Sequence, residues 1–550
     1  MINTVISVQD RFYKQITFVF IVAIIIVFRI WLASSFSHEI NADLIHDDFL
    51  FVRLAESVAK GEWLGKFDEF TFIKGSGYPI LIAIMYLLKI PLIYFQLGLY
   101  IIASLLASYF VYLTSRSRKK TFFIVSLLIF LFNPATFDAN LNFRVNRPAI
   151  YSPMCFLVLD LLLFTIYNRK QISAKQLLAY WLLGFVIFLC WITREESVWL
   201  LLPIIITALF IIFDFKSKKL LLFNIAGMLI SLYTFTALLF SLARKNNTYY
   251  GAPILTEFQH PAFISAYGSL IRVKPEEFIP YVPVSNNTRQ KISKESRLFA
   301  DINQYLDGDV GTGWAIVTQE EAPIEGHKGE IGGGWFIWAL RDSVARAGYY
   351  TNINQALSFY KQLSKEVNLA CEEKRLDCFP RRDTFIFPWN NYYFGNIIQN
   401  TKIFVYKLIV FNNVSIFYKN QMEPEENYLM FREMIIDPFT QQGAEIKTKI
   451  ILLFIFIYKT IYSIIIICGI GLVFIVQIIN YKKLLTSGIA YVYIAMSGIT
   501  SLGTIVVLLA SVSYPPALNT GYMGPLYPWA SMLGTLSWVV LYNFIYRGKK

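Results

Sequence analysis

Two adjacent carboxylates, Asp47 and Asp48, have the residue types and spacing that acid–base chemistry needs. An aspartate just before a helix also commonly caps it, because its carboxylate accepts hydrogen bonds from free backbone N–H groups of the first turn. The pair therefore has two interpretations: a helix cap, or a general base for a hydroxyl group. In the second, we expect the neighbouring negative charge to raise the pKa of one carboxyl group.

A cationic pair follows at some distance, in the segment from Asn142 to Tyr151. Arg144 and Arg147 are three residues apart, so on a helical turn both guanidinium groups face one direction. Arginine matches phosphate oxygens with two parallel hydrogen bonds, which favours a phosphate site. The alternative is that both side chains reach lipid headgroups from the membrane boundary.

A third group of charges, Arg194, Glu195 and Glu196, interrupts about forty otherwise apolar residues. Charges in such a place are costly unless they pair or carry a function. The interruption is either a turn whose arginine and glutamates pair with each other, or a part of one site together with the two groups above. Asp160 is a further carboxylate within an apolar run, with no partner visible in the sequence.

The elements that must position these groups are membrane spans. Hydrophobic residues make up 56% of the 550 residues and charged residues only 16%, which is typical of a multi-pass α-helical membrane protein. The formal net charge of +13 does not indicate nucleic acid, because the basic residues cluster in short loops between apolar runs. By the positive-inside rule these loops face the cytoplasm, and so do both termini.

About ten spans are predicted on this basis. They are expected near residues 16–33, 92–113, 121–133, 149–167, 176–192, 197–213, 220–242, 449–479, 484–511 and 526–546. The apolar stretch from Tyr78 to Leu88 is too short to cross and is expected to lie along the outer surface. Before it, apolar residues recur at helical spacing and Gly61 follows, which predicts a short surface helix with this apolar face: Phe51, Leu54, Ala55 and Val58.

Three domains result: residues 1–242, with the first outer loop at 37–88; an extracytoplasmic domain at 243–447; and C-terminal spans at 448–550. The inserted domain is predicted to be α/β or mostly α. Cys371 and Cys378 lie in it with six residues between them, and an oxidising compartment permits a disulfide there. Trp335 and Trp338 are either core aromatics or a sugar-stacking surface. The four histidines show no metal-ligand spacing.

The first outer loop resembles that of the GT-C membrane glycosyltransferases related to protein O-mannosyltransferases and to the enzymes that add aminoarabinose to lipid A, family 39-like proteins. The matching features are an acidic pair, an alanine, a Gly-x-Trp and a lysine before a proline, here Asp47-Asp48, Ala55, Gly61-Glu62-Trp63, Lys74 and Pro79. This sequence lacks the Pro-Pro pair of that pattern. In the last outer loop it has Gly521-Tyr522-Met-Gly-Pro525 where the family often has Arg-Tyr.

The resemblance implies inverting transfer of a sugar from a polyprenyl phosphate to a glycan, lipid or protein acceptor, at the outer face of the bacterial cytoplasmic membrane. It implies that Asp47 is the base and that Asp48 positions a substrate. The donor phosphate and sugar would be bound by Lys74, Arg144, Arg147, Arg194, Glu195 and Glu196. It implies no nucleotide, no nucleic acid and no certain cofactor, and leaves a divalent cation open.

Two other classes of protein also fit many apolar spans with polar groups among them. One is a lipid or solute transporter or flippase, and the other is a membrane-anchored surface assembly or receptor protein. The sequence lacks the paired broken-helix halves that many transporters have. Transfer from a polyprenyl-phosphate sugar separates the three.

Overall fold

The computed structural model describes residues 2–34, 38, 46–142, 144–214, 217–411, 444–479 and 487–547, and these residues are mostly helical. They contain no β-strand, and an isolated bridge joins Val273 to Cys378. Parts of the predicted first outer loop, residues 412–443 of the predicted outer domain and the basic pair Lys482-Lys483 lie outside the described residues.

Eight helices in the described part of the chain are long and apolar enough to cross a membrane. They fall in α1 (Ile2–Ala33), α4 (Leu92–Thr114), α7 (Pro148–Asn168), α8 (Ala174–Thr193), α9 (Leu201–Phe213) with the 3-10 turn before it, α10 (Lys218–Tyr250), α19 (Ala444–Ile457) continued by α20 (Ser463–Ile479), and α21 (Ser487–Val512). The protein is therefore a multi-pass helical membrane protein.

Two of the ten predicted spans are not among these eight. α5 (Lys120–Leu131) has 12 residues, fewer than the roughly 20 that cross a hydrocarbon core. α23 (Leu526–Arg547) has 22 residues but is less apolar, since Ser531, Ser537 and Asn543 lie along it. The apolar runs identified both as helices, but neither has the length and hydropathy of the other eight.

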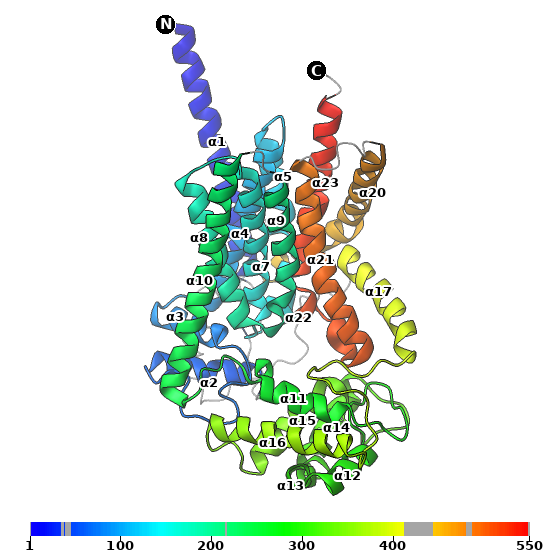
Figure 1. The fold of residues 1–550 in the computed structure, drawn as a ribbon. Coiled ribbons are helices and arrows are strands. Elements are labelled where there is room, and N and C mark those ends of the chain that lie inside the picture. The colour runs from blue at the N-terminus through cyan, green and yellow to red at the C-terminus, as the bar shows by residue number, and fades with distance from the viewer. Residues whose placement is uncertain are drawn as a thin grey trace.

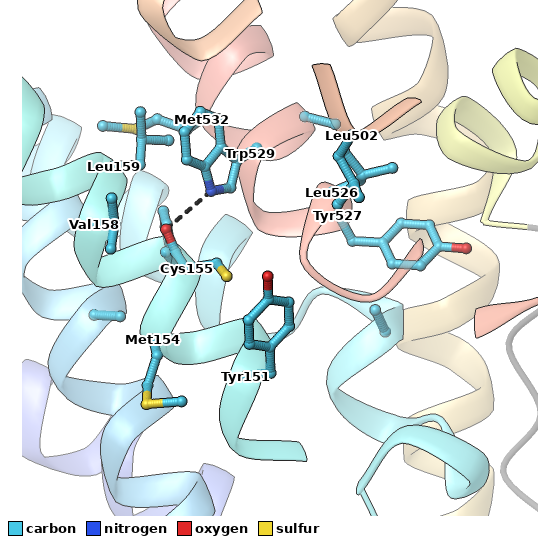
Figure 2. Close-up of a cluster of buried hydrophobic side chains, with 14 of the residues drawn as sticks. Tyr151, Met154, Cys155, Val158, Leu159, Leu502, Leu526, Tyr527, Trp529 and Met532 are labelled. Atoms are coloured by element: carbon cyan, nitrogen blue, oxygen red, sulfur yellow. Dashed lines mark hydrogen bonds between the residues drawn. The ribbon is translucent and has the colours of Figure 1, made fainter. Parts of the chain in front are cut away.

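α7 is the central helix of the bundle. It is buried around most of its circumference and packs against α4, α8, α21 and α23. Figure 2 shows its contact with α23, where the indole Nε1 of Trp529 donates a 3.0 Å hydrogen bond to the carbonyl oxygen of Cys155. α7 carries polar side chains that would be costly against lipid, among them Ser152, Asp160 and Thr165, and its central position buries them.

The first outer loop forms two short helices at one end of the bundle, α2 (Asp48–Ala59) and α3 (Gly77–Leu87), which pack against each other. The predicted apolar face of α2 is inward, with Phe51, Leu54 and Ala55 buried. Gly61 follows the helix with a φ of 83°, a left-handed conformation that suits glycine. α3 has 11 residues and exposes apolar side chains such as Ile84 and Leu87.

A cluster of helices follows α10: α11 (Pro261–Ile271), α12 (Asn286–Glu295), α13 (Arg297–Leu306), α14 (Asp309–Glu321), α15 (Gly333–Arg346) and α16 (Ile353–Glu372). They surround a hydrophobic core of their own, and we call them the cap. In Figure 1 the cap lies at the end of the bundle opposite the start of α1 and the end of α23. A disulfide joins Cys371 to Cys378.

The edges of the cap differ from the predicted limits of 243 and 447. α10 runs for 33 residues to Tyr250, and its polar end is held by the first outer loop: Trp63 donates to Asn246, and Tyr250 donates to the carbonyl of Gly65. At the other edge, α17 (Tyr392–Val410) packs along α21 and inserts Phe404 and Leu408 into the core of the bundle. α6 (Ala139–Asn142) and α22 (Thr520–Met523) are single turns between longer helices.

Candidate functional site

A cavity of about 2100 Å³ lies between the cap and the end of the bundle that faces it. The first outer loop, the ends of α7, α8 and α21, and the cap helices α14 and α15 line it. Seven of the eight predicted site residues are among the lining residues: Asp47, Lys74, Arg144, Arg147, Arg194, Glu195 and Glu196. Asp48 is the exception, since its side chain is completely buried behind the wall.

Asp47 precedes α2 in the position of a helix cap, yet its side chain makes no capping hydrogen bond. Its carboxylate instead pairs with the ammonium group of Lys74, and a guanidinium nitrogen of Arg144 lies 3.7 Å from Oδ2. Burial opposes the charge of Asp47, but Lys74 and Arg144 outweigh it and lower the pKa of Asp47 to about 2. The expected rise in pKa from a neighbouring carboxylate is therefore wrong for Asp47, because these two cations outweigh any effect of Asp48.

Asp48 holds Arg144 in place. The guanidinium Nε of Arg144 donates to both carboxylate oxygens of Asp48, at 2.7 and 2.9 Å. An ionised carboxylate without exposure needs such a partner, and Arg144 supplies it from 96 residues away. Arg144 thus touches both acidic residues, one behind the cavity wall and one on it.

Arg147 and Glu195 form the next pair along the wall. Arg147 stands just before the first turn of α7, and its Nη1 donates to the two carboxylate oxygens of Glu195 at 2.9 and 2.7 Å and to the carbonyl of Thr193 at 3.1 Å. Glu195 also accepts a 3.0 Å hydrogen bond from the backbone N–H of Gly75. Gly75 fits there because a Cβ would lie 2.2 Å from the carbonyl oxygen of Ile192. The pair therefore ties the first outer loop to α7 and α8.

Arg194 pairs with Glu196 two residues on, through Nε and Nη2 at 3.1 and 3.0 Å. Its Nη1 donates to the carbonyl of Gly521 at 2.7 Å, and the ring of Tyr522 lies 4.9 Å from the guanidinium carbon. The sequence predicts Arg194 and Glu196 either as a self-paired turn or as part of a site. The two residues do pair with each other, and both line the cavity.

The charges on this side of the cavity balance. Four cations meet four carboxylates, and each cation has an ionic partner. A negatively charged ligand at this wall would therefore have to share these cations with their carboxylate partners. Among the described residues, no three His, Cys, Asp or Glu side chains are grouped so that they could hold a metal ion.

Sequence reasoning missed the opposite side of the cavity. His46 lies with its ring 5.4 Å from that of Trp314 and 5.2 Å from that of Trp338, centroid to centroid. Asp342 of α15 accepts a 2.9 Å hydrogen bond from the indole of Trp314 and lies 3.4 Å from Nε2 of His46. Metal-ligand spacing does not single out His46, and no local pattern relates it to its neighbours in the cap, which lie up to nearly 300 positions away. The sequence predicts Trp335 and Trp338 as either core aromatics or a sugar-stacking surface. Of the two, Trp335 is buried against Tyr514.

Tyr514 follows α21 and connects the two sides. Burial, together with the negative charges of Glu321 and Asp47, raises the pKa of Tyr514 to about 12, so its hydroxyl keeps its proton at neutral pH. Asp160 lies elsewhere: it is completely buried in α7 and does not line the cavity.

No protein-family model matches this chain, and no curated protein and no solved structure matches it either.

Proposed function

We propose that this protein is an inverting glycosyltransferase of the GT-C type, which moves a sugar from a polyprenyl phosphate to an acceptor at the outer face of the bacterial cytoplasmic membrane. The observation that carries the proposal is the position of Asp47. It lines a large cavity at the end of a membrane bundle and has several cations beside it. Both termini are then cytoplasmic, and the cap is extracytoplasmic.

The reaction needs a base, an anion site and a path for a lipid. In the transfer step the acceptor oxygen forms a bond to the anomeric carbon of the sugar. The bond from that carbon to the phosphate oxygen breaks on the opposite face. The acceptor's hydroxyl proton passes to the carboxylate of Asp47, and polyprenyl phosphate leaves with the bonding electrons.

A carboxylate with a pKa of about 2 is a weak base for a free hydroxyl group. It serves here because the hydroxyl proton becomes strongly acidic once the new C–O bond is largely formed, so transfer to Asp47 is late. The same ion pairs keep the carboxylate of Asp47 ionised and fix its orientation. A base needs both before the substrate arrives. Asp48 is then a positioning residue that acts through Arg144.

The leaving phosphate gains negative charge as the bond breaks, and fixed cations nearby stabilise that charge. Four such cations line the cavity on the bundle side: Lys74, Arg144, Arg147 and Arg194. Glu195 and Glu196 hold two of these arginines and leave other N–H groups to contact the phosphate or the sugar hydroxyls.

An apolar strip leads from the membrane to this anion site, as a lipid-linked donor requires. Residues at helical spacing on one face of α21 line the cavity: Ile505, Leu508, Leu509 and Val512. Since α21 is one of the long apolar helices, a polyprenyl chain can lie along this strip while its phosphate reaches Arg194.

The experiment measures sugar transfer by the full-length protein in lipid nanodiscs, with synthetic polyprenyl-phosphate sugars and a panel of lipid, glycan and peptide acceptors. Asp47→Asn keeps the shape of the side chain but cannot accept the proton, so we expect transfer to fall by about 10³-fold while membrane insertion persists. Asp68→Asn is the matched control: Asp68 pairs with Arg53 in the same loop and does not line the cavity.

Full transfer in Asp47→Asn would remove the proposed base. Transport of the labelled lipid across the bilayer when the protein is placed in sealed liposomes, with no covalent product under any condition, would replace the enzyme with a transporter.

A further inference from the structure

Three aromatic rings from distant parts of the chain meet at the cap side of the cavity. Trp314 comes from α14, Trp338 from α15 and His46 from the first outer loop. The two indoles are nearly parallel, with an angle of 19° between their planes and 6.5 Å between their centroids, and His46 lies beside both. We call His46, Trp314 and Trp338 the aromatic cluster.

The aromatic cluster faces the cavity, unlike the core of the cap. Phe336 and Tyr360 are completely buried in that core, whereas Trp314 and Trp338 are only partly buried and line the cavity. The structure therefore leaves aromatic surface at a place that a ligand can reach.

A hydrogen-bond acceptor stands at the edge of the aromatic cluster. Oδ2 of Asp342 accepts from Trp314 and faces His46, which fixes the carboxylate. Within the described residues its other oxygen, Oδ1, accepts no hydrogen bond, and the side chain is 21% exposed where it lines the cavity. This oxygen is ready for a hydroxyl group of a ligand.

Aromatic faces with one fixed carboxylate suit a sugar ring. The C–H bonds on one face of a pyranose carry partial positive charge and are attracted to the negative face of an aromatic ring. Its hydroxyl groups at the ring edge donate to a carboxylate. A phosphate or carboxylate ligand fits poorly here, because Asp342 repels it.

The aromatic cluster is close to the proposed base. The ammonium group of Lys74 pairs with Asp47 and at the same time lies 5.4 Å from the ring centroid of Trp338. His46 precedes Asp47 directly in the chain. A ring held by Trp338 can therefore present a hydroxyl group to Asp47.

We infer that His46, Trp314, Trp338 and Asp342 form a subsite for a sugar ring of the acceptor, so that the acceptor is a glycan or a glycolipid. The inference rests on the proposed function for its direction. The donor phosphate takes the arginines of the bundle, and the acceptor, which attacks from the face opposite the phosphate, takes the cap side of Asp47.

The subsite is tested first by binding, without any transfer. The probes are methyl pyranosides of glucose, galactose, mannose and N-acetylglucosamine, observed by saturation-transfer difference NMR on the full-length protein in nanodiscs. We expect at least one probe to receive saturation mainly on the C–H groups of one ring face. The signal falls at least fivefold in Trp338→Leu and in Asp342→Asn, and Trp338→Phe keeps most of it.

Matched controls separate a lost subsite from a damaged fold. Trp181→Leu replaces an exposed tryptophan of α8, and Asp301→Asn replaces a cap carboxylate that contacts Tyr349. Neither residue lines the cavity, so both variants should bind like the unchanged protein. An absence of signal for every probe, or an equal loss in Trp338→Leu and Trp181→Leu, would overturn the subsite.

Transfer kinetics distinguish this inference from the function on which it rests. With a glycan acceptor, Trp338→Leu should raise the KM for acceptor about tenfold and leave the KM for donor unchanged. Transfer with an unchanged acceptor KM in this variant overturns the subsite and keeps the enzyme. Pyranoside binding that depends on Trp338, without transfer to any acceptor, keeps the subsite and rejects the enzyme.

Discussion

The two sides of the cavity differ in the chemistry of their side chains. The bundle side consists of charges, with four cations and four carboxylates that compensate one another at the ends of membrane helices. The cap side consists of aromatic rings around one carboxylate, Asp342. A compensated charge network holds an anion by exchanging partners, whereas aromatic faces hold a neutral ring without moving. In the proposed function, one cavity receives two unlike substrates, with Asp47 between them.

Removing a cation from the bundle side gives the strongest test of this contrast. Arg194→Ala deletes a donor aimed at the charge that develops on the phosphate, so we expect kcat/KM for the donor to fall by about 10²-fold. The KM for a glycan acceptor should not change. Steady-state kinetics with each substrate varied in turn measure both values.

A control is needed because Arg194→Ala also leaves Glu196 without its partner. In the double variant Arg194→Ala, Glu196→Gln the unpaired charge is removed, so thermal stability should recover while donor use stays low. Recovery of donor use in the double variant, or equal effects on both substrates, would break the division between the two sides.

The second test loosens the cap side as a whole. Arg341 of α15 pairs with Glu257 at 2.7 Å, with both side chains at most 1% exposed, and also donates to the backbone carbonyl of Glu69 in the first outer loop. Arg341→Met leaves Glu257 buried without its ionic partner, which costs about 3–5 kcal/mol of folding free energy. We expect a lower melting temperature of the cap.

The catalytic consequence of Arg341→Met should be confined to the acceptor. Because Arg341 connects α15 to the loop that carries Asp47, acceptor use should fall more than donor binding does. Arg346→Met is the control, since Arg346 leaves the same helix into solvent with a 64% exposed side chain. Unchanged stability in Arg341→Met would show that the pair does not hold the cap.

The smallest expected effect is a flat pH profile on the acid side. The pKa of Asp47 is lowered to about 2, so the ionised form is kept above that value and is lost only as the pH falls through it. Asp47 should therefore contribute no loss of kcat/KM between pH 8 and 5. The measurement is kcat/KM against pH, repeated in a His46→Gln background to remove the nearby imidazole.

On the alkaline side, the dependence of kcat/KM on pH is expected to reflect Lys74. Burial lowers the pKa of Lys74 despite its pairing with Asp47, so its charge is lost at a lower pH than that of an ordinary lysine. Lys74→Arg should move the alkaline loss of activity to higher pH, because arginine keeps its proton. An acid loss centred above about pH 4 that persists in His46→Gln would contradict the ion pairing of Asp47.

Much of the fold is predictable from local patterns. Long apolar runs predict eight of the membrane helices, and the spacing of Phe51, Leu54 and Ala55 predicts α2 and its buried face. The limits of the cap are less predictable, because the polar end of α10 looks like a loop and continues as a helix to Tyr250. α17 lies within the predicted outer domain but packs on α21, a contact that depends on the path of the whole chain.

The sequence by itself determined which charged residues stand at the outer ends of the apolar runs, because hydropathy and helical periodicity are local properties. Only the tertiary structure decided their partners: Lys74 for Asp47, Arg144 for Asp48 and Glu195 for Arg147. It alone brought two tryptophans of the cap beside His46. Such partners are separated by 27 to nearly 300 residues along the chain. Their contacts follow from how helices pack against one another, and a short stretch of sequence does not contain this information.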